Sequence, residues 1–225
     1  MKILYIEAKS KTKPEEYFID PTFLKNLPKK VFLCYTIQNK GQAETMKKAL
    51  EHYNIAVTGF QQVLGCSKLK VPEGIAIILI GQGRFHALNL ALQNKRPIIQ
   101  YGNGSSIVIG QKEIEQNNER KKNSINLFLH AQDIGIIVST KPGQEYFDRS
   151  RKLKQIIEQK YSEKNVILFV SNNINTNEFE NFDIDFWINS ACPGLINDSP
   201  KLINIDDIFE FSAVENIYSQ KQKGL

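Results

Sequence analysis

Short apolar runs alternate along the chain with longer stretches in which apolar residues recur at helical spacing. In the first half, the apolar runs that predict strands lie at residues 31–37, 55–60, 74–81 and 97–102. The amphipathic stretches that predict helices lie between them, at residues 41–53 and 85–95. The continuous run 74–81 is typical of a strand that a parallel sheet buries on both faces. This alternation predicts an α/β fold.

The second half repeats the scheme. Apolar runs predict strands at residues 133–140, 165–172, 185–191 and 201–208, and residues 143–162 predict a helix. The halves also align by sequence, because Thr36 and Gly41-Gln42 of the first correspond to Thr140 and Gly143-Gln144 of the second. We therefore expect an internal duplication: two similar parallel-sheet α/β domains, residues 29–110 and 132–225, joined by a basic, polar helix over 111–131.

Three cysteines lie on segments that end predicted strands: Cys34, Cys66 and Cys192. Ligands of open α/β sheets bind at the carboxyl ends of the strands. Cys66 and Cys192 would lie at that edge, in a cleft that the loops of both domains share. Cysteines that are distant in sequence but all at strand ends are able to converge on one iron–sulfur cluster. The alternative is packing, because free cysteine is among the residues most often buried.

The composition of the chain indicates in which cellular compartment these cysteines would act. No apolar run approaches the roughly 18 residues that cross a bilayer, and the N-terminal sequence lacks the apolar core of a signal peptide. We therefore expect a cytoplasmic protein without membrane contact, whose reduced thiols serve packing, metal binding or catalysis. The net charge of +5 is mildly basic. Its one tight cluster, residues 120–122, fits a solvated helix face, so we expect no direct nucleic-acid contact.

Five sequence blocks occur in the order of a known family: Thr36-Ile37-Gln38, QQVLGC (61–66), GQGRFHAL (81–88), VSTKPGQ (138–144) and ACP (191–193). Through these blocks, roughly residues 18–208 resemble the diphthamide synthase family, the 2-(3-amino-3-carboxypropyl)histidine synthases. The resemblance implies three similar α/β domains around a pseudo-threefold axis, each supplying one cysteine to a [4Fe–4S] cluster. It also implies S-adenosylmethionine (SAM) as cosubstrate, whose 3-amino-3-carboxypropyl group is transferred to a histidine of translation elongation factor 2.

The resemblance implies roles for residues of the matched blocks. Cys66 and Cys192 correspond to metal ligands of the cluster, and Arg84 and His86 to catalytic residues. The residues expected to bind SAM are Gln38, Gly83, Arg84, Ser139, Thr140, Lys141, Gly143 and Gln144. Simpler interpretations remain open: both cysteines as buried thiols, His86 as a helix cap or surface residue, and loop 139–144 as a plain turn in which Ser139 or Thr140 caps a helix.

The chain departs from the family pattern in two places. Residues 1–9 resemble the last strand of the family's first domain, so residues 1–28 are expected to be a remnant of that domain and a linker, and its cysteine has no counterpart. The third cluster ligand would then be Cys34, a residue of a partner chain or a non-protein group. Ala87 and Asn89 replace the Pro and Gly of the family's GRFHPLG block.

Three hypotheses follow for the function. The first is a shortened diphthamide-synthase-like enzyme, which would work as a homodimer or as a heterodimer with a full-length diphthamide synthase paralogue. The second is a non-catalytic subunit that supports such a paralogue. The third is a small-ligand-binding α/β protein without iron.

Overall fold

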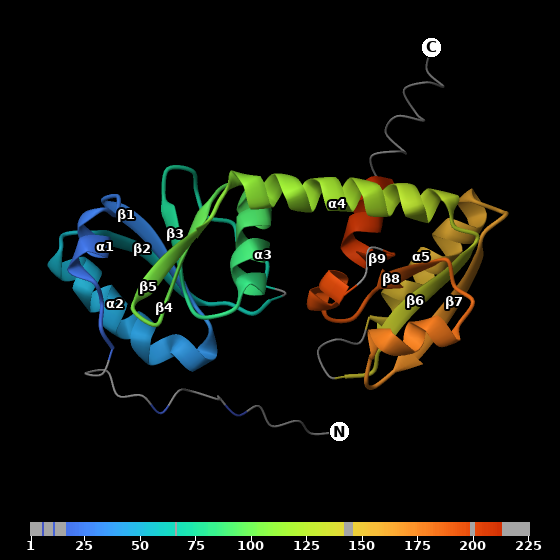
Figure 1. The fold of residues 1–225 in the computed structure, drawn as a ribbon, viewed down its shortest axis with the longest axis horizontal. Coiled ribbons are helices and arrows are strands. Elements are labelled where there is room, and N and C mark those ends of the chain that lie inside the picture. Colours follow the sequence, from blue (N-terminus) through green and yellow to red (C-terminus); the bar gives the residue numbers. More distant parts are fainter. Residues whose placement is uncertain are drawn as a thin grey trace, which may run out of the picture. The chain divides into compact units, whose positions relative to one another are not determined.

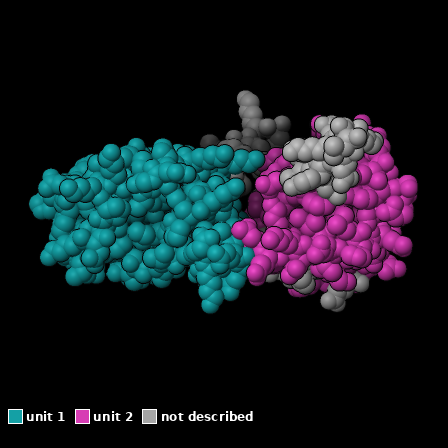
Figure 2. Space-filling model, turned by 90° about the horizontal axis from the view of Figure 1, so that it is seen from above, with its two compact units in different colours: residues 1–116 teal, residues 117–225 magenta. Residues whose placement is uncertain are grey.

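The computed structural model of the chain describes residues 17–65, 67–141, 146–198 and 201–212, together with Ile6 and Lys11. The chain divides into two compact units, residues 1–116 and 117–225 (Figure 2). The predictions for the N-terminal strand and for Cys66, Gly143 and Gln144 lie outside the described residues. Among the helices of the described part, none combines the length and the apolarity that crossing a bilayer requires.

Unit 1 contains a five-stranded sheet with the strand order β2–β1–β3–β4–β5 (Figure 1). Its strands are β1 (Lys30–Tyr35), β2 (Ala56–Gln62), β3 (Ala76–Ile80), β4 (Ile98–Gly102) and β5 (Ser105–Ile109). Strands β1 to β4 are parallel, and β5 turns back as an antiparallel edge strand. Asn103 and Gly104 make the turn before β5, both with positive φ, which an Asn-Gly pair adopts readily in a two-residue hairpin.

Helices cover both faces of the unit 1 sheet. They are α1 (Pro21–Lys25), α2 (Lys40–His52) and α3 (Arg84–Asn94), with a short 3-10 helix η2 (Ile37–Asn39) directly before α2. Successive strand residues point to opposite faces. Leu33 therefore packs with Met46 of α2, whereas Cys34 packs on the other face with Leu90 of α3. Each face of the sheet thus has its own apolar core.

Unit 2 contains a parallel four-stranded sheet with the strand order β7–β6–β8–β9. Its elements are β6 (Asp133–Ser139), α5 (Phe147–Lys160), β7 (Asn165–Ser171), η3 (Thr176–Asn181), β8 (Phe186–Asn189), η4 (Pro193–Asp198) and β9 (Leu202–Asn204). Trp187 lies across Gly135 of the neighbouring strand, where an added Cβ would overlap the indole ring. The orders β2–β1–β3 and β7–β6–β8 match, as an internal duplication would require.

Helix α4 (Gln111–His130) begins in unit 1 and ends in unit 2. Ile114 near its start packs into a core of unit 1, and Phe128 near its end packs into a core of unit 2. The buried Lys164 holds the carboxyl end, because its ammonium group donates to three backbone carbonyls there. A cation at this place satisfies carbonyls that a helix leaves without partners and suits the helix dipole.

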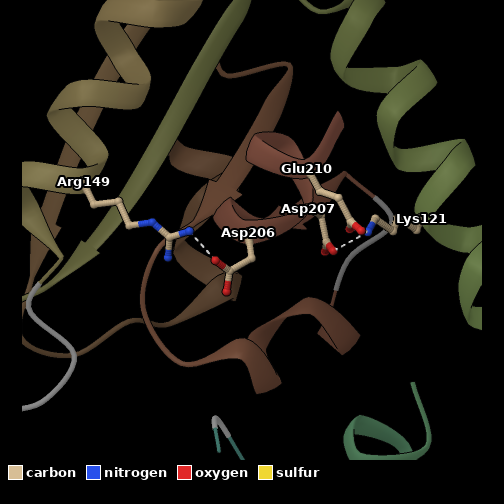
Figure 3. A network of polar contacts seen from close by, with 5 residues as sticks. All are labelled: Lys121, Arg149, Asp206, Asp207 and Glu210. Atoms are coloured by element: carbon tan, nitrogen blue, oxygen red, sulfur yellow. Dashed lines mark hydrogen bonds and ion pairs between the residues drawn. The ribbon is translucent and has the colours of Figure 1, made fainter. Parts of the chain in front are cut away.

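A further helical segment follows β9 at residues 205–212, so the predicted strand over 201–208 is wrong beyond Asn204. Ion pairs to neighbouring helices support the helix (Figure 3). Lys121 of α4 pairs with Asp207 at 2.8 Å and with Glu210 at 2.5 Å, and Arg149 of α5 pairs with Asp206. Helical spacing of three residues brings two carboxylates to one ammonium group.

The α/β class that the hydrophobic pattern predicts is confirmed, and the other expected elements differ from the structure mainly at their ends. The predicted strand 31–37 ends at Tyr35, where η2 takes over, and the predicted strand 185–191 ends at Asn189. The pattern does not predict β5, because that edge strand begins with two serines and is largely exposed.

Candidate functional site

A small pocket of about 150 Å³ lies at the carboxyl edge of the unit 2 sheet. Its lining residues come from the ends of three neighbouring strands: Ser139 and Lys141 of β6 and its loop, Asn172 and Ile174 after β7, and Ala191, Cys192 and Leu195 after β8. Parallel strands bring their carboxyl ends to one edge, so residues that are distant in sequence meet there. The structure thus brings together three of the residues singled out by sequence: Ser139, Lys141 and Cys192.

Cys192 is a free, exposed cysteine in the turn between β8 and η4. Asn189, the last residue of β8, holds this turn. Its Oδ1 accepts a hydrogen bond from Ala191 N at 2.9 Å, and its Nδ2 donates to Cys192 O at 2.8 Å. Pro193 opens η4 directly after the cysteine, and its ring fixes the backbone angle φ. The thiol is therefore carried by a turn whose backbone is fixed on both sides.

Strand β6 ends in a buried residue, and the two residues directly after it are exposed. Ser139 is buried, and its Oγ accepts from Lys141 N at 3.1 Å, whereas Thr140 and Lys141 are exposed. Helix α5 begins at Phe147, with Tyr146 at the N-cap. Neither Ser139 nor Thr140 caps that helix, so the interpretation of these residues as helix caps is wrong. Ser139 and Lys141 instead line the pocket.

The second group of expected residues lies at the carboxyl edge of the unit 1 sheet, after the neighbouring strands β1 and β3. Gly83 has a φ of 88° and is the N-cap of α3, where it offers no side chain to the first amides. Arg84 is exposed, and its Nη2 lies 3.3 Å from Oε1 of Glu113. His86 is half-buried, and desolvation lowers the pKa of its imidazole. Gln38 is exposed in η2.

A buried glutamine that sequence reasoning missed supports this edge. Gln100 of β4 donates from Nε2 to the carbonyls of Gly81, at 3.0 Å, and Gly83, at 3.3 Å. Its Oε1 is buried and has no hydrogen-bond partner among the described residues. The signal in the sequence is one polar residue within an apolar run, because a buried polar group requires partners. Gln100 fixes the β3–α3 turn that presents Arg84.

Side chains of α3 hold the two residues that flank Cys66 in the sequence. Asn89 Nδ2 donates to Gly65 O at 2.5 Å, and Gln93 Nε2 donates to Ser67 O at 2.7 Å. Asn89, one of the residues at which the sequence departs from the block GRFHPLG, thus binds this turn through its side chain. Helix α3, which begins with Arg84, thus also anchors the Cys66 segment.

Cys34 lies within a core of unit 1, with no exposed surface (0%). It packs with Leu79 and with Leu90 of α3. Burial raises the pKa of its thiol to about 12, so the group is neutral near pH 7, whereas metals bind the thiolate. The structure therefore supports packing for Cys34 and argues against Cys34 as the third cluster ligand.

The chemistry of the unit 2 pocket fits one corner of an iron–sulfur cluster with an anionic ligand beside it. Cys192 offers a thiol, Lys141 offers an ammonium group, and Ile174 and Leu195 offer apolar walls. Within the described part of the chain, to which Cys66 does not belong, no three His, Cys, Asp or Glu side chains gather as a metal site. A cluster at this pocket therefore requires ligands besides Cys192.

Comparison with known proteins points to a family. Residues 1–202 match the family model "Putative diphthamide synthesis protein". The chain is 29% identical over 175 residues to the 2-(3-amino-3-carboxypropyl)histidine synthase of Methanocaldococcus jannaschii, and 27% over 183 residues to that of Pyrococcus horikoshii. Both alignments cover 76% of this chain, but 46% and 52% of those relatives, so the chain spans about half their length.

Solved structures share the fold. Crystal structures of Dph2 from Pyrococcus horikoshii match the chain with a TM-score of 0.71 and, for the one with a 4Fe-4S cluster, 0.72, both at 23% identity. Each match covers 83% of this chain and 58% of the Dph2 chain. The structural match supports the α/β architecture, and the family model covers most of the sequence. The chain belongs to the family of diphthamide synthesis proteins.

Proposed function

We propose that the chain is a diphthamide-synthase-like iron–sulfur enzyme that transfers the 3-amino-3-carboxypropyl group of SAM to a histidine of elongation factor 2. The two relatives carry the name of this activity, and a solved relative holds a 4Fe-4S cluster. The observation that carries the proposal is the pocket that brings Cys192 together with Ser139 and Lys141 at the carboxyl edge of a parallel sheet.

Cys66 and Cys192 are the proposed cluster ligands. They would hold a [4Fe–4S] cluster, which in its reduced form would supply the electron for cleavage of the Cγ–S bond of SAM. The task of the protein is to bind and orient SAM and to exclude competing reactions. The exposed thiol of Cys192 suits ligation, and the hydrogen bonds from Asn189 keep its turn in place.

The loop after β6 is the proposed binding segment for the carboxylate or ribose of SAM. Lys141 supplies positive charge at the pocket, and the Oγ of Ser139 orients the backbone of Lys141. Thr140, Gly143 and Gln144 belong to the same proposed segment and add hydroxyl, amide and backbone N–H donors.

The edge of unit 1 would contribute a second anionic subsite. Backbone amides at the start of α3 suit an anion, and the guanidinium of Arg84 binds a carboxylate through two parallel hydrogen bonds. Glu113 pairs with Arg84 in the structure, so the ligand would displace that carboxylate. His86 is neutral near pH 7 because burial lowers its pKa, and it can accept a proton. Gln38 and Gly83 are the remaining proposed contacts.

A non-catalytic subunit of a full-length diphthamide synthase paralogue is the second candidate. The burial of Cys34 favours it, because that burial leaves Cys66 and Cys192 as the cysteines available for a cluster. An active enzyme would then require a third cluster ligand, either from a partner chain in a homodimer or a heterodimer or from a non-protein group. The two candidates differ in whether SAM is cleaved when this chain carries the iron.

Anaerobic reconstitution with iron and sulfide tests both candidates. The chain is loaded alone and together with a full-length diphthamide synthase, and electron paramagnetic resonance spectra are recorded with and without SAM. Methylthioadenosine released on reduction reports cleavage of SAM. We expect Cys66→Ala and Cys192→Ala to lose the cluster signal, and the matched control Cys34→Ala to keep it.

The outcomes separate the candidates. Cluster formation with methylthioadenosine release supports the enzyme. A cluster that leaves SAM intact, combined with a gain in activity of the paralogue, supports the subunit. If this chain binds no iron in either setting, the enzyme is contradicted, and the subunit is contradicted as well if the chain leaves the activity of the paralogue unchanged.

A further inference from the structure

Asn189 is a polar residue in a strand that is otherwise fully apolar. Strand β8 is buried along its whole length, and Asn189 is 1% exposed at its carboxyl end. It pairs with Asn204 of the edge strand β9 on one side. A buried carboxamide destabilises a fold unless its donors and acceptor find partners. The hydrogen-bond partners of the Asn189 side chain therefore indicate its role in the fold.

Every hydrogen-bonding group of the Asn189 carboxamide has a defined partner. The Oδ1 accepts from Ala191 N at 2.9 Å. The Nδ2 donates to Cys192 O at 2.8 Å and to Asn204 Oδ1 at 2.8 Å, which uses both of its hydrogens. The first two bonds hold the backbone N–H of Ala191 and the backbone carbonyl of Cys192, which lie on either side of the peptide bond between these two residues. The third bond anchors the carboxamide itself to the neighbouring strand.

The residue type follows from this pattern. Aspartate would keep the acceptor for Ala191 N but would turn an oxygen toward Cys192 O and Asn204 Oδ1, where a donor is needed. Alanine would remove the carboxamide, so Ala191 N, Cys192 O and Asn204 Oδ1 would each lose this hydrogen-bond partner. The anchored amide therefore acts on the turn of Cys192 through both a donor and an acceptor, which a purely space-filling residue would not require.

We propose that Asn189 is a positioning residue for Cys192, which places its thiol in the pocket that also contains Ser139 and Lys141. The proposal rests on the proposed function, in which Cys192 is a cluster ligand. Partners in the outer shell of a metal site typically change metal affinity by about 10- to 100-fold when they are removed. Asn189 acts through the backbone of Cys192, so its loss alters where the thiol lies and leaves the thiol itself in the chain.

The test compares Asn189→Ala with Asn204→Ala. Both lose the bond between the two asparagines, but Asn204→Ala keeps both bonds to the Cys192 turn. Each variant is reconstituted with iron and sulfide beside the wild type, with the full-length paralogue added if the wild type needs it. The readouts are the rate of iron loss to a chelator and the electron paramagnetic resonance spectrum. We expect iron loss about 10- to 100-fold faster in Asn189→Ala, with an altered spectrum, and wild-type behaviour in Asn204→Ala.

Trp187 provides the control for folding, because it lies two residues before Asn189 in the same strand and is 5% exposed. If the tryptophan emission of the iron-free Asn189→Ala variant stays that of the folded wild type and the variant keeps the wild-type iron retention and spectrum, the proposal is overturned. If the emission shifts to that of the unfolded chain, the smaller, uncharged replacement Asn189→Ser is used instead, and the same two readouts decide.

If the wild type retains no iron in any setting, the proposed function fails. Hydrogen exchange of the iron-free proteins then tests by itself whether Asn189 positions the Cys192 turn. Faster exchange confined to residues 190–195 in Asn189→Ala, and absent in Asn204→Ala, supports the placement of the turn by Asn189. Equal exchange in both variants contradicts it.

Discussion

The segments of Cys66 and Cys192 are both held by asparagine carboxamides, but from different distances in the sequence. Asn189 reaches the turn of Cys192 from three residues away, at the end of the same strand. Asn89 reaches Gly65 from a separate helix, 24 residues further along the chain. The unit 2 turn therefore keeps its shape through local bonds. The Cys66 segment also has local turn bonds between Leu64 and Ser67, but the side chains that tie it to the rest of unit 1 belong to α3.

This difference links Cys66 to the Arg84–His86 block. Helix α3 starts with that block, and the same helix carries Asn89 and Gln93, which hold the residues on either side of Cys66. A shift of α3 would move the anionic subsite and the Cys66 segment together. Helix α5 contacts the start of the Cys192 turn through a hydrogen bond of 2.7 Å between Ser150 Oγ and Ser190 Oγ, whereas the bonds at Ala191 N and Cys192 O come from Asn189 and Leu195, which are close in sequence. We therefore expect changes in unit 1 to spread further than changes in unit 2.

Gly65→Ala is expected to have the largest effect. The Phe85 ring lies where the new Cβ would stand, so the ring, α3 or the turn must move. We expect a loss of about 1–3 kcal/mol in the free energy of unfolding, the range typical of overpacking. Gly41→Ala is the control, because a Cβ there meets Tyr17 at an ordinary 3.5 Å.

The single tryptophan, Trp187, lies in unit 2, so its fluorescence follows that unit during urea unfolding while circular dichroism follows both units. We expect Gly65→Ala to shift the circular dichroism transition and to leave the fluorescence transition unchanged. A shift of the fluorescence transition alone would contradict the assignment of this turn to unit 1.

Asn89→Ala removes the hydrogen bond to Gly65 and tests the long-range anchor. We expect a loss of about 1 kcal/mol in the free energy of unfolding, typical of one hydrogen bond, and faster hydrogen exchange in residues 61–72. Gln82→Ala is the matched control, because Gln82 bonds to Asn103 on the exposed surface of the same unit. Unchanged exchange in residues 61–72 of Asn89→Ala would mean that Asn89 does not anchor this segment.

Glu113→Gln tests whether Glu113 competes with an anionic ligand for Arg84. Arg84 is largely exposed in this ion pair and Glu113 is partly exposed, so the pair contributes at most about 1 kcal/mol. We expect SAM to bind up to about fivefold more tightly to the loaded variant in calorimetry. Glu115→Gln, on the same helix, should bind SAM as the wild type does. Weaker binding in Glu113→Gln would contradict the competition.

His86 should give the smallest effect, a dependence of stability on pH. Burial lowers the pKa of the folded imidazole below its usual 6.5, so the unfolded chain binds more protons below that pH. His86 is therefore expected to destabilise the fold as the pH falls from about 6.5 toward the folded pKa. The urea midpoint of the wild type should fall more than that of His86→Gln between pH 7.5 and pH 5.5. If the urea midpoints of the wild type and of His86→Gln fall equally with pH, His86 makes no such contribution.

The sequence predicts the two regions unequally for physical reasons. The apolar runs and the ACP block place Cys192 near a strand end, although the predicted strand 185–191 extends past Asn189, where β8 ends. The anchor of Cys66 depends on which face of α3 meets the turn, and that face is decided by tertiary packing. Gln100 was missed because one polar residue in an apolar run does not reveal its partners.

Two errors in the fold have similar causes. Residues 201–208 contain three isoleucines, which favour a strand. Asp207 and Glu210 meet Lys121 only through contacts that are distant in sequence. Strand β5 follows an Asn-Gly pair, which is a strong hairpin signal, but its serines and exposed surface hide the apolar pattern.

Differential alkylation of the three cysteines tests the central claim most directly. The protein, alone and with its full-length paralogue, is treated with iodoacetamide before and after iron loading, and each cysteine is quantified by mass spectrometry. We expect Cys66 and Cys192 to react in the iron-free protein and to be protected after loading, and Cys34 to stay unreactive in both states. Equal alkylation of Cys192 with and without bound iron would contradict the proposed ligand set.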